Sequence, residues 1–368
     1  MSRTALAAKP RERAIDLFKG LLVIGMVYCH TLQFFSDPQA YPNGQRIIDL
    51  VNLITFSGFV FAFGYASQLA YYAKPFRQAA PRMLLTALKT LIGFYVSGTA
   101  YRLFIDGRRL SWDNIRPILT IDDMPGWSEF LVSFAYLMLA GLVLFAPLRW
   151  LAERRWLGFA AAGALLLTTL IPYGSIHGMK LGPLIGTRDF ASFPVLQYFP
   201  YYLIGMLFAR HRIGWSWKVL AGAAAGTGLF LWKWLSAEDR VLPERFPPSV
   251  WWIVGPALLL YGYYLLARRM EKVPRPFAPI ETLGRNVLWY LVLSNVLIFA
   301  LKSNQPDTLV SALDGLWMAL VFLAVVSFGV WITTKPPRSR PAAPDIPGVS
   351  GVSSDSSVPS STRRTIRQ

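Results

Sequence analysis

The chain has 368 residues, of which 54% are hydrophobic, and its mean hydropathy is positive. Repeated apolar runs of roughly 17–25 residues, each long enough to cross a bilayer as a helix, predict an all-α polytopic membrane protein. The net charge of +17 does not indicate a nucleic-acid partner, because most basic residues stand in short loops between apolar segments, where they set topology or contact the lipid bilayer.

The apolar runs divide the chain into three regions. Residues 1–13 are polar and basic, and we interpret them as a cytoplasmic leader. Residues 334–368 are rich in Pro, Ser and Arg and lack the side chains for a core, so we predict a disordered cytoplasmic tail. Between them, residues 14–333 form one membrane domain with about ten predicted transmembrane helices, at roughly 14–35, 48–73, 83–105, 128–149, 156–172, 191–209, 217–236, 249–268, 283–302 and 309–333.

The distribution of Lys and Arg indicates how these spans are oriented. Counted on alternate sides of the ten predicted spans, 23 basic residues fall on the side of both termini and 10 on the other. The side richer in Lys and Arg is normally the cytoplasmic one, so both termini are predicted to be cytoplasmic, and an even number of spans agrees with this. The longer loops lie on the outer side, at 106–127, 173–190 and 237–248, and there we expect an acceptor to bind.

The first predicted span carries two polar side chains that a lipid-facing helix would exclude. Lys19 and His30 are eleven residues apart, and in an α-helix this separation is about 1100° of rotation and about 16.5 Å of rise, so both point from one face. Ionisable residues inside a membrane segment are costly and usually face a functional interior. The charge bias puts Lys19 near the cytoplasmic mouth and His30 well past the cytoplasmic leaflet.

This arrangement suits a long ligand that is anionic at one end and reactive at the other. An acyl-coenzyme A thioester has that form, with phosphates at its nucleotide end and a thin arm that carries the acyl group. On this hypothesis Lys19 helps to hold phosphate, and His30 acts either as the general base for an attacking hydroxyl or as a covalent carrier of the acyl group. From spacing alone, a snorkelling lysine and a histidine bonded to a backbone carbonyl remain an alternative explanation.

Five short motifs follow one another along the membrane domain. The first is the run beginning Asp16-Leu-Phe-Lys19-Gly20, in which ten residues separate Lys19 from His30. Together the motifs resemble the integral-membrane acyltransferase 3 family, whose first helix carries an Arg or Lys followed, after ten residues, by a His. The resemblance covers roughly residues 11–333. The other four motifs are Phe56-Ser57-Gly58-Phe59, the run from Trp127-Ser128-Glu129-Phe130, Phe199-Pro200 leading to Gly205 and Arg210, and Leu283-Gly284-Arg285-Asn286.

The resemblance implies an enzyme of the inner (cytoplasmic) membrane that moves an acetyl or short acyl group to a hydroxyl of an envelope or exported carbohydrate. The donor it implies is cytoplasmic acyl-CoA, commonly acetyl-CoA, and the acceptor is a glycan or a lipid-linked carbohydrate; no metal is expected. His30 would be the catalytic residue and Lys19 a ligand of the acyl-CoA phosphates. The sequence leaves the oligomeric state open.

The sequence also departs from the family pattern at two places. The family often has two arginines three residues apart after the second span, and here only Lys74 and Arg77 have that spacing, so we assign these two to acyl-CoA binding as well. Many members carry a histidine in the ninth span, where this chain has Ser294 and Asn295. The role of that histidine is therefore absent or altered here.

Several interpretations stay open at this point. Lys89, in the third predicted span, is either a buried partner for a ligand or a snorkelling residue, and Glu129 is either a carboxylate partner of His30 or a solvated acid at a helix start. A transporter or flippase for a lipid-linked or polysaccharide substrate is the main functional alternative. Such proteins usually show paired halves with broken helices in matching positions, and no such symmetry is visible. A membrane scaffold that has lost the activity is a third.

Overall fold

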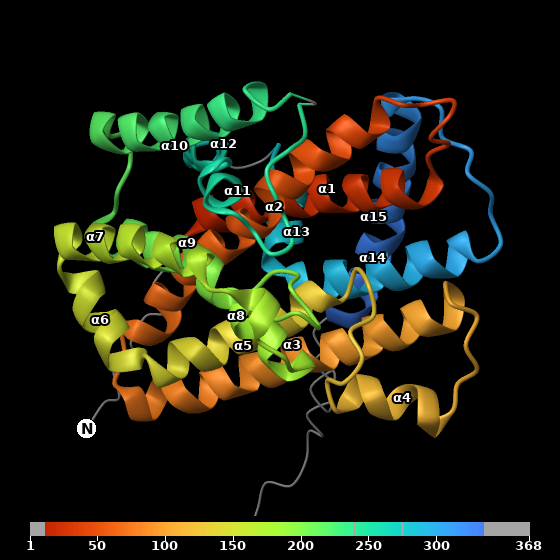
Figure 1. Cartoon of the computed structure of the whole chain (residues 1–368), viewed down its shortest axis with the longest axis horizontal. Helices are drawn as coiled ribbons and strands as arrows, with labels where there is room; N and C mark the ends of the chain where they lie inside the picture. Colours follow the sequence, from red (N-terminus) through yellow and green to blue (C-terminus); the bar gives the residue numbers. More distant parts are fainter. Residues whose placement is uncertain (1–11, 239, 274–275, 335–368) are drawn as a thin grey trace, which may run out of the picture. The chain divides into compact units, whose positions relative to one another are not determined.

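The computed structural model describes residues 12–238, 240–273 and 276–334, and within these ranges it contains helices and no β-strand (Figure 1). The chain divides into one unit that ends at Thr333 and a second, Thr334–Gln368. Residues 335–368 of the predicted tail (334–368) and residues 1–11 of the predicted leader (1–13) therefore lie outside the described residues.

The helices of this unit follow one another with short connections. They are α1 (Arg13–Phe35), α2 (Gly44–Ser67) with the π-turn η1 (Gln68–Tyr72), α3 (Phe76–Phe104), α4 (Trp112–Leu119), α5 (Glu129–Val143), α6 (Phe145–Glu153), α7 (Arg155–Leu165), the 3₁₀ turns η2 (Leu166–Leu170), η3 (Tyr173–Ser175) and η4 (Met179–Leu181), α8 (Gly182–Ile185), α9 (Val195–His211), α10 (Trp217–Leu235), α11 (Val250–Val254), α12 (Ala257–Met270), α13 (Ala278–Arg285), α14 (Val287–Lys302) and α15 (Ala312–Thr334).

Each predicted membrane span coincides with one or two of these helices, but not all of them are long and apolar enough to cross a bilayer alone. Five helical stretches in the described residues meet that requirement, and up to seven do if two bent pairs count as one span each. The all-helical, multi-pass prediction is therefore confirmed. The predicted spans at 156–172, 191–209 and 217–236 correspond to α7 with η2, to α9 and to α10, and the total of ten stays a prediction.

Two predicted spans are sharply bent. The helix axis turns by 79° between α5 and α6, at Leu144, and by 87° between α13 and α14, at Asn286. Pro147 lies in the first turn of α6, where the missing N–H of proline costs nothing, so the sequence favours a new helix start at that point. The second bend brings Arg285 and Asn286 to the wall of a cavity that Lys19 also lines.

Several helices turn apolar side chains outward. On α3, the side chains of Leu85, Leu88, Ile92 and Val96 recur at helical spacing, and about half of the surface of each is exposed. Such a stripe would be unfavourable in water, but it matches the hydrocarbon core of a bilayer. α15 presents a similar surface with Trp317, Val321, Val325, Phe328 and Trp331.

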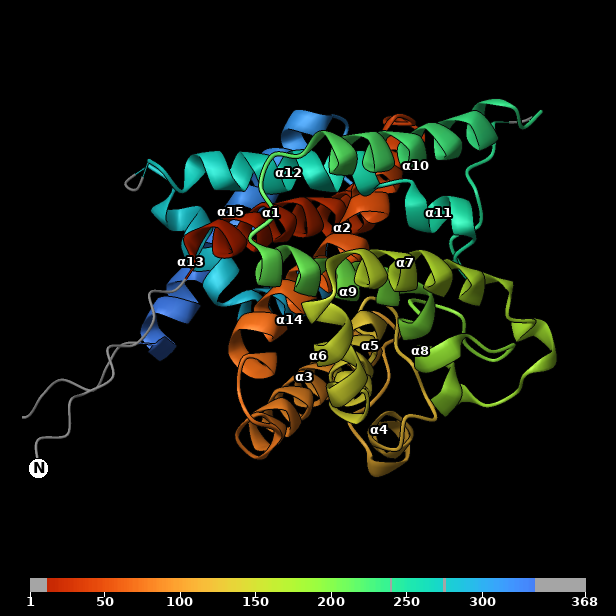
Figure 2. The ribbon, with the colours of Figure 1, turned by 90° about the vertical axis from the view of Figure 1, so that its left-hand side faces the viewer.

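α1 lies in the interior, in contact with α2, α12, α13 and α14, and α2 in turn packs along α9 (Figure 2). The α2–α9 contact is close because both helices carry a glycine where they cross. A Cβ atom at Gly205 would lie 2.1 Å from the Phe61 carbonyl oxygen, and one at Gly64 would lie 2.0 Å from that of Tyr202. The glycine that ends the Phe199-Pro200 motif is thus required by backbone contact, as in other small-residue helix crossings.

Candidate active site

His30 opens onto a cavity of about 250 Å³. α1 and α2 form one side of this cavity, and the start of α5 with two loop segments forms the other. His30 itself is buried, with 9% of its surface exposed. We call this space the histidine cavity; it is lined by Met26, Cys29, His30, Gln33, Asn52, Thr55, Phe56, Phe59, Gly126, Trp127, Glu129, Phe130, Phe193, Arg245 and Phe246.

A chain of hydrogen bonds fixes the protonation of the His30 ring. Asn295 Nδ2 donates to the carbonyl oxygen of Trp127 at 2.9 Å and to Ser97 Oγ at 3.1 Å. Because a carbonyl oxygen only accepts, the amide nitrogen of Asn295 must face Trp127, and Oδ1 must face His30 Nδ1, which lies 3.0 Å away. Nδ1 therefore carries the proton and donates it to Asn295. Nε2 is left with a free lone pair, the form that a general base requires.

Two charged side chains at the histidine cavity carry buried atoms without a partner. Glu129 Oε2 and Arg245 Nε are both shielded from solvent, and neither has a hydrogen-bond partner among the described residues. The Arg245 guanidinium carbon lies 4.4 Å from the ring centroid of Phe246 and 5.6 Å from that of Phe193. Buried polar atoms in proteins are normally paired, so these two mark a place where a polar ligand is expected.

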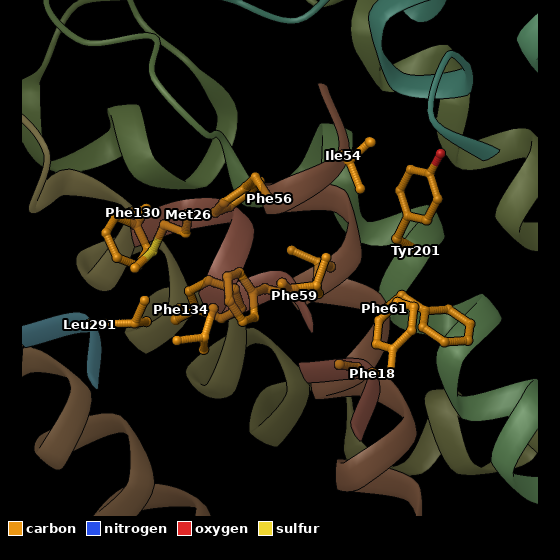
Figure 3. Close-up of a cluster of buried hydrophobic side chains, with 14 of the residues drawn as sticks. Phe18, Met26, Ile54, Phe56, Phe59, Phe61, Phe130, Phe134, Tyr201 and Leu291 are labelled. Carbon is orange, nitrogen blue, oxygen red and sulfur yellow. The ribbon is translucent and has the colours of Figure 1, made fainter. Parts of the chain in front are cut away.

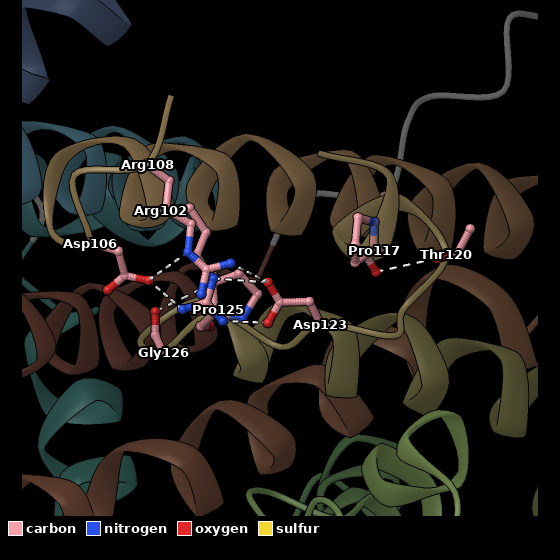
Figure 4. Close-up of polar contacts among 9 residues, drawn as sticks. Arg102, Asp106, Arg108, Pro117, Thr120, Asp123, Pro125 and Gly126 are labelled. Carbon is pink, nitrogen blue, oxygen red and sulfur yellow. Dashed lines mark hydrogen bonds and ion pairs between the residues drawn. The ribbon is translucent and has the colours of Figure 1, made fainter. Parts of the chain in front are cut away.

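The loop that delivers Trp127 and Glu129 is held by an ion-pair cluster at the end of α3 (Figure 4). Arg102 Nε donates to Asp123 Oδ2 at 2.9 Å, and the same guanidinium also bonds Asp106. Trp127 Nε1 then donates to Gln33 Oε1 on α1 at 2.8 Å. Both ends of the loop are thereby tied to membrane helices, so the residues at the mouth of the histidine cavity are positioned before any ligand binds.

A second cavity, of about 500 Å³, contains the lysine of the first helix. Lys19, Lys89 and Arg285 contribute three cations to its wall, and we call it the basic cavity. Lys19 Nζ lies 2.7 Å from the buried carboxylate of Asp16, which also faces Arg285 Nε at 3.8 Å. Arg285 in addition pairs with Glu281, and Glu281 with Arg13. Lys19 is thus oriented by an ion-pair network that joins α1 to α13.

Phe59 separates the two cavities and lines both of them. It stands in a group of aromatic side chains from α2 and α5 with Phe56, Phe130 and Phe134, as Figure 3 shows. Its ring lies 6.5 Å from that of Phe134, centroid to centroid, nearly at right angles. Lys19 and His30, which helical spacing puts on one face of α1, thus line two different cavities, with the aromatic ring of Phe59 between them.

The other residues assigned to acyl-CoA from the sequence lie elsewhere. Lys74 is in the turn between η1 and α3, and Arg77 is an exposed residue in the first turn of α3. Neither is among the residues that line the basic cavity, whereas Lys89 is. Lys89 is an exposed residue of α3 that lines this space together with Thr86, which stands three residues earlier.

A family model described as an acyltransferase domain, of the acyltransferase 3 type, matches residues 12–335. The chain belongs to the acyltransferase 3 family. This confirms the resemblance carried by the five motifs, and it makes the protein a multi-pass membrane acyltransferase that needs an acyl donor and an acceptor. No curated protein matches the sequence.

Three residues that line the two cavities or bond to His30 had no assigned role at the level of sequence. Asn295 was visible only as a departure from the histidine of many family members, yet it holds the ring of His30. Arg245 lies in the predicted outer loop 237–248, to which no residue role was assigned, and Arg285 was named only as part of the fifth motif. For Glu129 the sequence left two interpretations open. Its position in the histidine cavity favours a carboxylate partner of His30 over a solvated acid at a helix start.

Proposed function

We propose that this acyltransferase moves an acetyl or short acyl group from cytoplasmic acyl-CoA to a hydroxyl of an envelope or exported carbohydrate. The observation that carries the proposal is the pair of cavities on either side of Phe59, one basic and one built around His30. In the proposed topology, ten helices span the inner membrane and both termini are cytoplasmic. The basic cavity then belongs to the cytoplasmic half, and the histidine cavity faces the outer loops.

The basic cavity suits the donor. Lys19, Lys89 and Arg285 contribute three cations to its lining, whereas Asp16 and Glu281, which pair with Lys19 and Arg285, bring two negative charges. Phosphate groups of a coenzyme A would be held by such cations through charge-assisted hydrogen bonds. Lys74 and Arg77 stand on the same predicted side of the membrane, where they would contact the nucleotide end outside the cavity. The acyl arm would reach His30 past Phe59.

The histidine cavity suits the reaction. The lone pair of His30 Nε2 accepts the proton of an acceptor hydroxyl as its oxygen attacks the thioester carbonyl, and the thiolate of coenzyme A leaves and regains a proton from the ring. Asn295 stabilises the imidazolium by accepting from Nδ1–H. The carboxylate of Glu129 in the same cavity adds electrostatic stabilisation of that cation, and Arg245 is available for the developing oxyanion.

The wall of the histidine cavity also suits a sugar. Trp127, Phe193 and Phe246 offer flat apolar surfaces, while Gln33 and Asn52 offer hydrogen-bonding groups beside them. Cavities that combine apolar walls with a few placed polar groups are typical of small-molecule sites. All three aromatic residues lie in or next to segments between helices, on the side that the charge distribution predicts to be outside.

The proposal is tested with purified protein in proteoliposomes, radiolabelled acetyl-CoA and an envelope glycan extract. Wild type should transfer label to carbohydrate, and His30→Ala should abolish transfer without changing the thermal stability by much. Cys29→Ala is the matched control, since Cys29 lies beside His30 and lines the same cavity. Label that accumulates on the protein and depends on His30 would indicate a covalent carrier instead of a general base. Equal transfer by wild type and His30→Ala would refute the proposal.

A further inference from the structure

A third cavity lies apart from the two that serve the acyl transfer. It has a volume of about 280 Å³ and is bounded by α7, α9, α10 and α12 together with Phe61 of α2, and none of its lining residues lines the histidine cavity or the basic cavity. α7 packs on α9 and α10 packs on α12, and α7 and α10 run in roughly the same direction in both views (Figures 1 and 2). The space between these pairs is a groove. We call it the α7–α10 groove.

The long walls of the α7–α10 groove are apolar. α9 contributes Ile204 and Phe208, and α10 contributes Val219, Gly222 and Ala223. The polar atoms of its two tyrosines from α12 are already bonded. Tyr264 donates to the Ile213 carbonyl at 2.8 Å, and Tyr261 donates to Gly214 at 3.0 Å while accepting from Ser216 N–H at 2.8 Å. The walls are thus fixed in place and offer hydrocarbon contacts.

One end of the groove is cationic. Arg155 opens α7 and Lys218 stands in the first turn of α10, and both line the groove. The Arg155 guanidinium carbon and Lys218 Nζ lie 5.3 Å and 5.1 Å from the ring centroid of Trp156, so two positive charges converge on one indole. No Asp or Glu is among the residues that line the groove. The buried Arg155 Nε has no hydrogen-bond partner in the part of the chain that the structure describes.

We propose that the α7–α10 groove binds an anionic phospholipid, with its phosphate on Arg155 and Lys218 and an acyl chain along α9 and α10. The charges of Arg155 and Lys218 repel each other when no carboxylate lies between them. A phosphate between them removes that repulsion and accepts a hydrogen bond from the unpaired Arg155 Nε. The starts of two helices add a favourable field for an anion. The apolar side chains of α9 and α10 match an acyl chain. A ligand with both a phosphate and an acyl chain pairs with the two cations and also covers the apolar walls.

The groove is separate from the proposed reaction, so its test needs no acyl transfer. Purified protein in mild detergent is mixed with vesicles of phosphatidylcholine, either alone or with phosphatidylglycerol, and bound lipid is counted by native mass spectrometry. Wild type should retain phosphatidylglycerol in preference to phosphatidylcholine. Arg155→Gln/Lys218→Gln should reduce that retention by roughly tenfold or more, because each cation contributes to binding of an anionic headgroup.

Two further variants separate the headgroup from the chain. Arg149→Gln/Arg269→Gln removes the same charge from exposed positions outside the groove and should leave retention unchanged. Gly222→Leu should lower retention of both lipids, since a Cβ at Gly222 meets open space and a larger side chain fills the groove without a clash. This variant keeps the test valid even if the double variant fails to fold.

Three outcomes would overturn the proposal. The first is an absence of any preference between the two lipids in wild type. The second is equal loss of retention in the control double variant, which would indicate a general effect of surface charge. The third is displacement of the lipid by inorganic phosphate alone at equal concentration, together with full retention in Gly222→Leu, which would identify a free phosphate site instead of a lipid site.

Discussion

His30 and Asn295 are 265 positions apart in the chain, and a hydrogen bond of 3.0 Å joins their side chains. Because Asn295 is itself anchored to the Trp127 carbonyl, the contact dictates which ring nitrogen of His30 carries the proton. A change at position 295 should therefore act on the reaction rather than on donor binding.

Asn295→Leu removes the acceptor for His30 Nδ1–H and leaves the ring free to adopt the unreactive tautomer. We expect kcat to fall by about 100-fold, within the range that general acid–base catalysis contributes, with the KM for acyl-CoA nearly unchanged. Ser294→Ala is the control, because Ser294 is equally buried but bonds only within its own helix. Steady-state kinetics of both variants test this prediction. Similar kcat values for Asn295→Leu and Ser294→Ala would contradict the role assigned to Asn295.

Much of this fold was predictable from the sequence, and the reason is physical. A membrane helix needs a long apolar run, so α1, α2, α3 and α15 could be placed from composition. The bends at Leu144 and Asn286 were not predicted, because a run of apolar residues has the same mean hydropathy whether it is straight or broken. Spacing within one helix likewise put Lys19 and His30 on one face.

The spacing of residues within one helix could not predict which residues contact Lys19 and His30. Asn295 and Trp127 meet His30 through helices far apart in the sequence, and a single sequence carries no signal for such contacts. Arg245 looked like any other loop charge until its cavity was known. The sequence could identify the reactive groups on the first helix. The residues that surround those groups come from several packed helices, and their positions could not be predicted from a single sequence.

Glu129 should matter for turnover and not for stability. Its Oε2 is buried and unpaired at the histidine cavity, so Glu129→Gln replaces a costly carboxylate with a neutral group of the same shape. We expect an unchanged or higher melting temperature together with a loss of activity of about 10-fold or more. Glu244→Gln, in an exposed loop position, serves as the control for charge. A Glu129→Gln enzyme with wild-type turnover would show that the carboxylate has no part in the reaction.

Phe59 should act as a seal between donor and acceptor. Replacement by Leu shortens the aromatic wall shared by the two cavities, and water from the acceptor side would then reach the thioester. We expect release of free coenzyme A without acceptor to increase several-fold relative to productive transfer. Thiol detection during acyl-CoA turnover measures this directly. Phe63→Leu changes the basic cavity alone and should show no such leak; an equal leak in both variants would contradict a seal at Phe59.

Lys89 should contribute to donor affinity. It lines the basic cavity with Lys19, and a charge-assisted hydrogen bond to phosphate is worth about 1.5–3 kcal/mol, so Lys89→Gln should raise the KM for acyl-CoA by roughly tenfold or more. Arg82→Gln, two turns earlier on α3 and outside the cavity, should have little effect. The same assay on Lys74→Gln/Arg77→Gln tests the assignment made from sequence spacing. A larger KM effect there than at Lys89 would move the phosphate site to the loop before α3.

The crossing of α2 and α9 should tolerate no side chain at its glycines. A Cβ at Gly205 would lie 2.1 Å from the Phe61 carbonyl oxygen, so Gly205→Ala must push the two helices apart. Overpacking of this kind typically costs on the order of 1–3 kcal/mol, and thermal unfolding in detergent should occur at a clearly lower temperature. Gly262→Ala on α12 is the matched control, since its Cβ meets open space and alanine favours the helix by about 1 kcal/mol. If both alanine variants unfolded at the wild-type temperature, the close α2–α9 contact would be wrong.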